Sequence, residues 1–220
     1  MIQSDKFDSF MNFKNNIEKI RNFLFKRLIE FFGVLLLISG LLILLSLISY
    51  NPNDPNFIYP SSQIIENLLG IRGSIVADFL FQSIGLVALF IPITLIFLSI
   101  SIIFEKKLVL IIKSLFFIIC YSIVGSIFFT QFYNEAFFLV INGNGGFVGN
   151  YFYNNTFFKI LNSNSQISYY LELSLFTVLF IISINFKLSW LVNLKNKLKK
   201  NNTKKTLEDN KYKDENFTTS

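Results

Sequence analysis

Histidine is absent from this chain of 220 residues, and cysteine occurs once, as Cys120. A single cysteine excludes a disulfide within the chain. The commonest ligands of zinc and haem are therefore nearly missing, and so is the usual general base. Charged residues make up only 15% of the chain, whereas soluble domains carry about a quarter. The sequence therefore predicts no catalytic residue, no cofactor and no metal.

Hydrophobic residues make up 52% of the chain and gather in long uncharged runs. The run 31–49 has nineteen residues without a charge, and at about 1.5 Å per residue such a helix spans the hydrocarbon core of a bilayer. We predict an all-α integral membrane protein. Its four transmembrane helices are expected at about 31–49, 77–104, 110–132 and 167–186, within a transmembrane domain covering residues 31–190.

The residues before the first span form an amphipathic arm, 1–30. Apolar side chains recur there every three or four positions, with most basic residues off that face. This pattern predicts a helix lying on the cytoplasmic leaflet. At the other end, residues 191–220 are rich in Lys and Asn and are expected to form a disordered cytoplasmic tail or the start of a linker.

The basic residues predict the topology. Eighteen of the twenty Lys and Arg residues fall in the arm, the 106–113 region and the stretch from Lys187 to Lys213, and only Arg72 and Lys159 fall in the two expected outer loops. The positive-inside rule then places both termini in the cytoplasm of a bacterial inner-membrane protein. This split also supports the fourth span, which is short and carries Glu172 near its expected outer end.

Several residues predict finer features of the spans. Pro92 lies inside the second apolar run and is expected to kink that helix. A short helix over 63–69, ended by Gly70, is expected on the outer surface. Asp78 and Glu172 are expected near helix ends, where water and headgroups solvate them.

A glycine-rich segment, Gly143-Asn-Gly-Gly-Phe-Val-Gly149, resembles a phosphate-binding loop only superficially. A P-loop needs a Lys-Ser/Thr pair at its end, and a dinucleotide fingerprint needs a preceding strand. The segment has neither, and the charge distribution places it outside. We expect a tight turn or a loop that dips back toward the bilayer.

Three segments, in order, resemble one family. They are Ser49-Tyr-Asn-Pro-Asn-Asp-Pro-Asn-Phe57, Asn67-Leu-Leu-Gly-Ile-Arg-Gly-Ser-Ile-Val-Ala-Asp78 and the Gly143–Gly149 segment. With the four-span layout, they resemble the N-terminal membrane domain of the FtsK/SpoIIIE DNA translocases over about residues 30–190. The resemblance implies a membrane anchor at the division septum that acts in cell division and chromosome segregation.

The resemblance also implies partners. These are the lipid bilayer, division proteins and further copies of the chain. The family's ATP-driven motor needs a Gly-x-x-x-x-Gly-Lys-Ser/Thr segment, which is missing from these 220 residues. We therefore expect no catalysis in this chain, and DNA contact only through a motor that is not present in it.

Nine residues in the outer loops are the candidate site. The prolines are expected to end a helix, the glycines to permit tight backbone geometry, and the aspartates to cap turns or helix starts. The sharper hypothesis is a surface for periplasmic division partners, and the alternatives are a small transporter or export subunit and an unrelated membrane scaffold. The nine are Pro52, Asp54, Pro55, Gly70, Gly73, Asp78, Gly145, Gly146 and Gly149.

Overall fold

The computed structural model describes residues 2–55, 65–133, 139, 141–154 and 165–185. Helix α1 spans Ile2–Ile48, α2 Gly70–Ile84, α3 Phe90–Glu105, α4 Val109–Phe132, α5 Gly146–Asn154 and α7 Ser165–Ile184. A short 3₁₀ helix, η1, joins α2 to α3 over Gly85–Leu89. No strand occurs in these residues, which confirms the all-α prediction.

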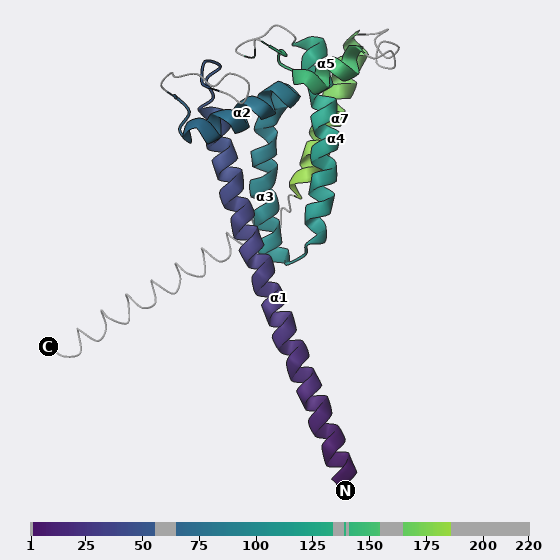
Figure 1. Ribbon diagram of the computed structural model, residues 1–220. Helices are drawn as coiled ribbons and strands as arrows, with labels where there is room; N and C mark the ends of the chain where they lie inside the picture. The colour runs from purple at the N-terminus through teal and green to yellow at the C-terminus, as the bar shows by residue number, and fades with distance from the viewer. Residues whose placement is uncertain (1, 56–64, 134–138, 140, 155–164, 186–220) are drawn as a thin grey trace, which may run out of the picture. The chain divides into compact units, whose positions relative to one another are not determined.

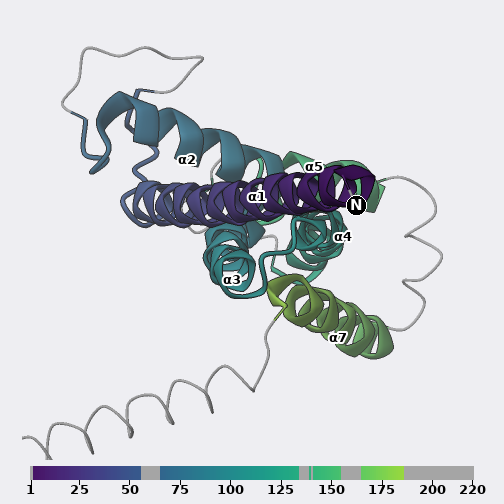
Figure 2. The ribbon, with the colours of Figure 1, turned by 90° about the horizontal axis from the view of Figure 1, so that it is seen from below.

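Among the described residues, four helical stretches are long and apolar enough to cross a membrane. They are Asn16–Ile48, Gly70–Glu105, Val109–Phe132 and Gln166–Ile184. Each overlaps one predicted span, including the fourth, so the four-helix prediction is confirmed. Helix α1 packs against α3 and α2, while α7 packs against α4 and α3. Figure 2 shows α1, α3, α4 and α7 from below, with α7 at the outer side of α4.

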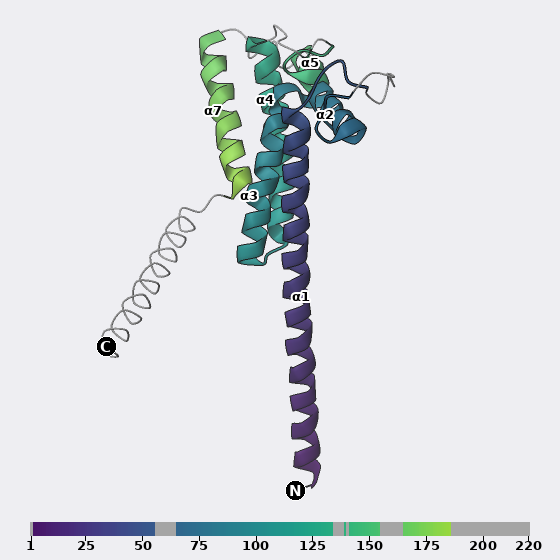
Figure 3. The same ribbon diagram turned by 90° about the vertical axis from the view of Figure 1, so that its left-hand side faces the viewer.

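The arm and the first span form one uninterrupted helix (Figures 1 and 3). The helical prediction for the arm is confirmed from Ile2 onward, but residue 30 marks no break in the backbone. Gly33 is the only glycine near this junction, and no proline is present to break the helix. That the arm lies along the membrane surface stays a prediction.

The pairing of α1 with α3 depends on two glycines. A side chain at Gly33 would collide with Ile103, and one at Gly40 would press on Ile96 at 3.1 Å. Small residues permit this close approach of two membrane helices. The positions of α1 that face its neighbours alternate in spacing between four and three residues, as one face of a helix requires. These positions are Ile29, Gly33, Leu36, Gly40, Ile43 and Leu47.

The second span differs from its prediction. A single helix over 77–104 with a kink at Pro92 was expected, but the chain is broken at Gly85, whose φ of +64° ends α2. Helix α2 lies across the end of the long helices, beside α5 (Figure 1). Pro92 is buried in the first turn of α3, where a missing N–H is best tolerated. The position of the break is therefore set by Gly85 and not by Pro92.

The outer segments also differ from expectation. Residues 63 and 64 of the predicted 63–69 helix lie outside the described residues, and 65–69 form an extended stretch and a turn. Gly70 begins α2 instead of ending a helix. The second outer loop contains helix α5, which the sequence did not predict. The tail 191–220 lies outside the described residues.

The ends of the helices define the topology of the domain. Lys106, in the turn between α3 and α4, forms an ion pair with Glu30 of α1. Lys113 near the start of α4 donates a hydrogen bond of 2.8 Å to Asn185, which follows α7. The first span is therefore entered, and the fourth is left, at the end that carries the α3–α4 turn. The motif segments gather at the opposite end, which we call the loop end.

Candidate functional site

The loop end begins where α1 stops, in the turn Asn51–Pro55. The side chain of Asn51 accepts a hydrogen bond of 2.9 Å from the backbone N–H of Asn53, and its carbonyl accepts one of 3.1 Å from Asp54. Such an Asn-centred turn competes with helix. Pro52 lies exposed in the turn, and Pro55 is buried at its end. The turn sends the chain back over the end of α1.

Asp54 fixes the return of the chain toward α2. Its carboxylate accepts hydrogen bonds from the backbone N–H groups of Glu66 at 2.8 Å and Asn67 at 2.9 Å. The side chain is 6% exposed, so both bonds are shielded from water. Hydrogen bonds to an ionised acceptor stabilise by about 1.5–3 kcal/mol each. Asp54 thus joins two segments twelve residues apart.

Asn67, which was not among the nine candidates, completes this joint. Its Nδ2 donates to the carbonyl oxygens of Ser46 at 2.8 Å and Ser49 at 3.3 Å, at the end of α1. Its Oδ1 accepts from the N–H of Leu69 at 3.1 Å. The last carbonyl groups of a helix have no partner within it. Asn67 therefore caps α1 from a segment that precedes α2.

The start of α2 packs directly on α1. Ser46 donates 2.6 Å to the carbonyl of Gly73, and Ser74 donates 2.7 Å to the carbonyl of Pro55. A side chain at Gly73 would collide with Asn67. Gly70 has a φ of +65° but open space around it, so it is needed for its backbone conformation alone.

Asp78 lies one helical turn after Ser74 in α2. The hydroxyl of Tyr50 donates 3.1 Å to its carboxylate, and Gln82 Nε2 lies 3.5 Å from the same oxygen. Burial, reinforced by the negative charge of Asp78, raises the pKa of the Tyr50 phenol. The neutral phenol is therefore the form that the fold favours.

The glycine-rich segment forms the second half of the loop end. The carbonyl of Asn144 accepts a hydrogen bond of 2.9 Å from the N–H of Leu86, directly after the break at Gly85. The fully buried Asn144 also donates 2.6 Å to the carbonyl of Tyr133. A side chain at Gly85 would overlap the Asn144 carbonyl. The backbone of the glycine-rich segment is therefore in direct contact with the backbone at the helix break.

The remaining glycines of this segment face α4. A side chain at Gly145 or at Gly149 would collide with Thr130 and with the carbonyl of Ser126. Gly146 has a φ of +66° and lies against the backbone of Gly85. The segment packs onto α4 and the α2–η1 break, and these contacts explain its glycines without any phosphate-binding geometry. That it dips toward the bilayer stays a prediction.

Two asparagines join the halves of the loop end. Asn142 donates to Gln82 Oε1 at 3.0 Å and to the Gln82 carbonyl at 3.2 Å. Asn150 of α5 donates 2.8 Å to the carbonyl of Asn142. A continuous set of polar contacts therefore runs from Tyr50 through Asp78 and Gln82 to α5. All nine sequence-selected residues lie at this one end of the domain.

An open groove of about 550 Å³ lies over this set of contacts. Its polar groups are those of Asp78, Gln82, Ser83 and Asn142, and its other lining residues are Ile75, Phe79 and Phe147. Phe79 and Phe147 are 67% and 61% exposed. Among the described residues, no three His, Cys, Asp or Glu side chains gather as metal ligands would. The groove is therefore an open surface that combines polar groups with two exposed aromatic rings.

Glu172 lies in the half of α7 nearer the loop end, partly buried against α4. It was expected near the outer end of the fourth span, solvated by water and headgroups. It is the eighth residue of α7, and it lines a pocket of about 190 Å³ with Val124 and Ile127 of α4. That water and headgroups solvate Glu172 stays a prediction, while α4 packs along this part of α7 and buries one of its carboxylate oxygens.

The chain matches the family described as "4TM region of DNA translocase FtsK/SpoIIIE" over residues 25–196. It belongs to this family. The match covers the motif-bearing segments of the loop end and reaches all four membrane helices, so the fold and the loop end described above are those of an FtsK-type membrane domain.

Individual relatives match a shorter stretch. The chain is 46% identical over 59 residues to the DNA translocase FtsK of Rickettsia typhi, and 43% identical over 61 residues to that of Rickettsia prowazekii. The Rickettsia bellii protein of the same name is 42% identical over 62 residues. These stretches cover 27–28% of this chain and only 8% of each relative. No solved structure matches the chain significantly.

Proposed function

We propose that this chain is the membrane anchor of an FtsK-like DNA translocase system, acting in cell division and chromosome segregation through protein contacts at the septum. The family match over residues 25–196 carries this proposal. The matched region is the membrane region of the family, and catalysis is not assigned to it. DNA would be reached through a motor that lies outside these 220 residues.

The loop end supplies the contact surface in this proposal. Asp78 lines the groove, and Gly145, Gly146 and Gly149 permit the close packing of the neighbouring glycine-rich segment, while the rings of Phe79 and Phe147 are exposed to a partner. Exposed aromatic side chains over a rigid base are typical anchors of protein interfaces. We infer that the partners are division proteins with domains in the periplasm.

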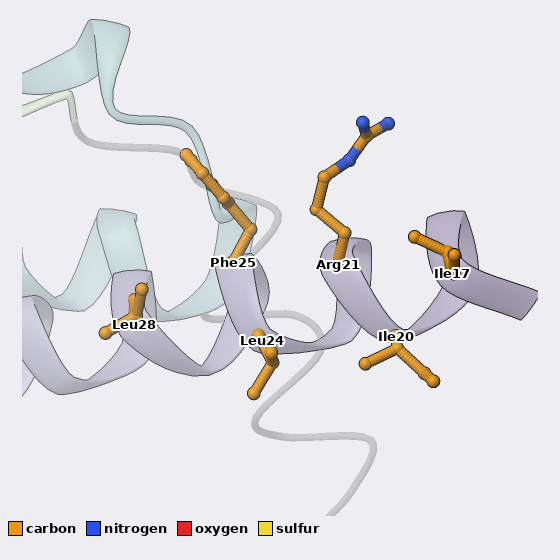
Figure 4. Close-up of a pocket in the computed structure, with 6 residues that line it drawn as sticks. All are labelled: Ile17, Ile20, Arg21, Leu24, Phe25 and Leu28. Atoms are coloured by element: carbon orange, nitrogen blue, oxygen red, sulfur yellow. The ribbon is translucent and has the colours of Figure 1, made fainter.

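The topology in this proposal follows the charge distribution. The arm, the α3–α4 turn and the tail lie in the cytoplasm of an inner-membrane protein, and the loop end faces the periplasm. The exposed apolar side chains of α1 before the bundle favour contact with lipid, because no other described element covers them (Figure 4). They are Ile17, Ile20, Leu24, Phe25 and Leu28. A membrane-lying arm would in addition need α1 to bend where it is continuous in the structure.

Fluorescent tagging of the full chain in dividing cells tests the function. We expect a band at the septum, which the double variant F79A/F147A weakens while the protein still inserts in the membrane. L68A is the matched control, because Leu68 is 72% exposed at the same end but does not line the groove. A uniform envelope signal for the unaltered chain would contradict the proposal and favour an unrelated scaffold, and substrate flux in proteoliposomes would favour the transporter alternative.

Cysteine labelling tests the topology separately. In a background with Cys120 replaced by serine, a membrane-impermeant maleimide should label N53C in intact cells and K107C only after lysis. Both positions are exposed in the structure. The opposite labelling pattern would reverse the orientation and remove the periplasmic surface from the proposal.

A further inference from the structure

Helix α7 combines two properties that conflict in a helix surrounded by lipid. Of the four candidate spans it is the least buried within the chain, and it is also the least hydrophobic. Lipid tails form no hydrogen bonds, so the most exposed span should be the most apolar. Helix α1, by contrast, is exposed and strongly apolar. The side chains that α7 exposes are nevertheless mostly apolar, so its low hydropathy comes from residues that are partly or fully buried, among them Glu172, Ser168 and Ser183.

Glu172 is the most polar residue in this part of α7. Its Oε2 is buried and has no hydrogen-bond partner in the part of the chain that the structure describes. Apart from Ser168, the other side chains of its pocket are apolar, and they are Val124, Ile127, Ile167, Leu171 and Leu175. An ionisable residue within a membrane span usually has a partner or a function.

We propose that the α4–α7 pocket around Glu172 is the docking site for a transmembrane helix of another protein, and that this helix carries a lysine or arginine at the depth of Glu172. Charge complementarity points to this occupant, because a cation would supply the donor that Oε2 lacks. The inference does not depend on the division role proposed above.

Two other occupants fit less well. A lipid amine lies at headgroup level, whereas Glu172 is seven residues inside α7, about 10 Å from its first residue. A second copy of the chain would have to offer a cation at this depth. In the described residues, Lys106 and Lys113 lie at the opposite end with Glu30 and Asn185 as partners, and Arg72 is in α2, outside the long helices.

Energy transfer in proteoliposomes tests the proposal with a defined probe. The labelled full chain is mixed with a labelled leucine-rich peptide of about 20 residues that carries one lysine about 10 Å from one end. We expect association that falls about ten-fold or more in E172Q, which removes the charge but keeps the shape. A peptide with leucine in place of the lysine should bind the unaltered chain as weakly as E172Q binds the lysine peptide. S174A, on an exposed position of the same helix, is the matched control and should bind normally.

The outcomes separate the occupants. Equal association of the lysine and leucine peptides, or no effect of E172Q, would overturn the proposal. Transfer between differently labelled copies of the chain that E172Q abolishes would favour self-association instead. Binding that requires phosphatidylethanolamine in the vesicles would favour a lipid amine. Since E172Q removes a charge from an apolar pocket, loss of folding is not expected, and circular dichroism of the variant checks this.

Discussion

The two ends of the membrane domain are held together by different means. The loop end is fixed by bonds between backbone groups and buried Asn, Asp and Ser side chains, with glycines where segments touch. The opposite end has a small buried set of bonds among Ser114, Ser183 and Asn185, and to these it adds exposed pairs such as Lys106 with Glu30. Buried polar bonds and glycine contacts therefore dominate the loop end, while exposed ion pairs are a feature of the other.

This difference predicts how each end responds to substitution. Buried groups that lose a partner and glycines that gain a side chain destabilise strongly. Exposed ion pairs contribute little, because water and salt screen them. Four substitutions test the contrast, beginning with the largest effect.

Gly85→Ala should have the largest effect. A methyl group there meets the Asn144 carbonyl, and the backbone conformation of φ +64° and ψ −146° is strained for alanine. We expect a loss of about 3 kcal/mol or more in the free energy of unfolding, measured by denaturant titration in detergent micelles. Gly70→Ala is the control: its φ is also positive but its surroundings are open, so it should lose only about 1 kcal/mol. Equal losses would show that close contact at Gly85 is unimportant.

Asp54→Ala should have the next largest effect. It leaves the N–H groups of Glu66 and Asn67 without their buried acceptor, and we expect a loss of about 2–3 kcal/mol. Limited proteolysis of the 50–70 segment should accelerate in parallel. Asn53→Ala, at the exposed neighbouring position, should change stability by less than about 0.5 kcal/mol. If Asp54→Ala left the free energy of unfolding unchanged, the contrast between the two ends would not hold.

Tyr50→Phe should have a smaller effect, about 1 kcal/mol, since it removes the hydrogen bond to Asp78 and keeps the ring. The raised pKa of the Tyr50 phenol adds a pH dependence. Its contribution is fully present below the unfolded pKa of about 10 and is lost as the pH rises through the folded value. Unfolding measured from pH 8 upward should show less alkaline destabilisation in Tyr50→Phe. The same decline in both proteins would mean that other groups cause it.

Glu30→Gln should have the smallest effect. The Glu30 carboxylate pairs with Lys106 and with Arg27, but the basic side chains are exposed to solvent, so water and salt screen both pairs. We expect no measurable shift in the thermal unfolding midpoint at physiological salt. A loss comparable with that of Asp54→Ala would show that both ends are equally specified.

The number of spans could be predicted from the sequence, because hydrophobic length is a local signal. The role of the nine selected loop residues stays a prediction, although the structure places all nine at one end of the domain. Asn67, Asn142 and Asn144 could not be predicted. Asparagine is common throughout the chain, so the few that bond to distant backbone groups are not distinguishable by type. The break at Gly85 was missed for a related reason: proline is the stronger local signal, but Pro92 occupies a helix turn that tolerates it.

The contact between Leu86 and Asn144 has a consequence for biosynthesis. Leu86 comes before α4 in the chain, and its hydrogen-bond acceptor comes after it. A nascent chain that has emerged only as far as α4 therefore holds an open helix break with no partner for that N–H group. The first two membrane-spanning stretches reach their final geometry only when α4 has been made and the segment around Asn144 has reached the loop end, so the order of synthesis makes the loop after α4 the closing step of assembly.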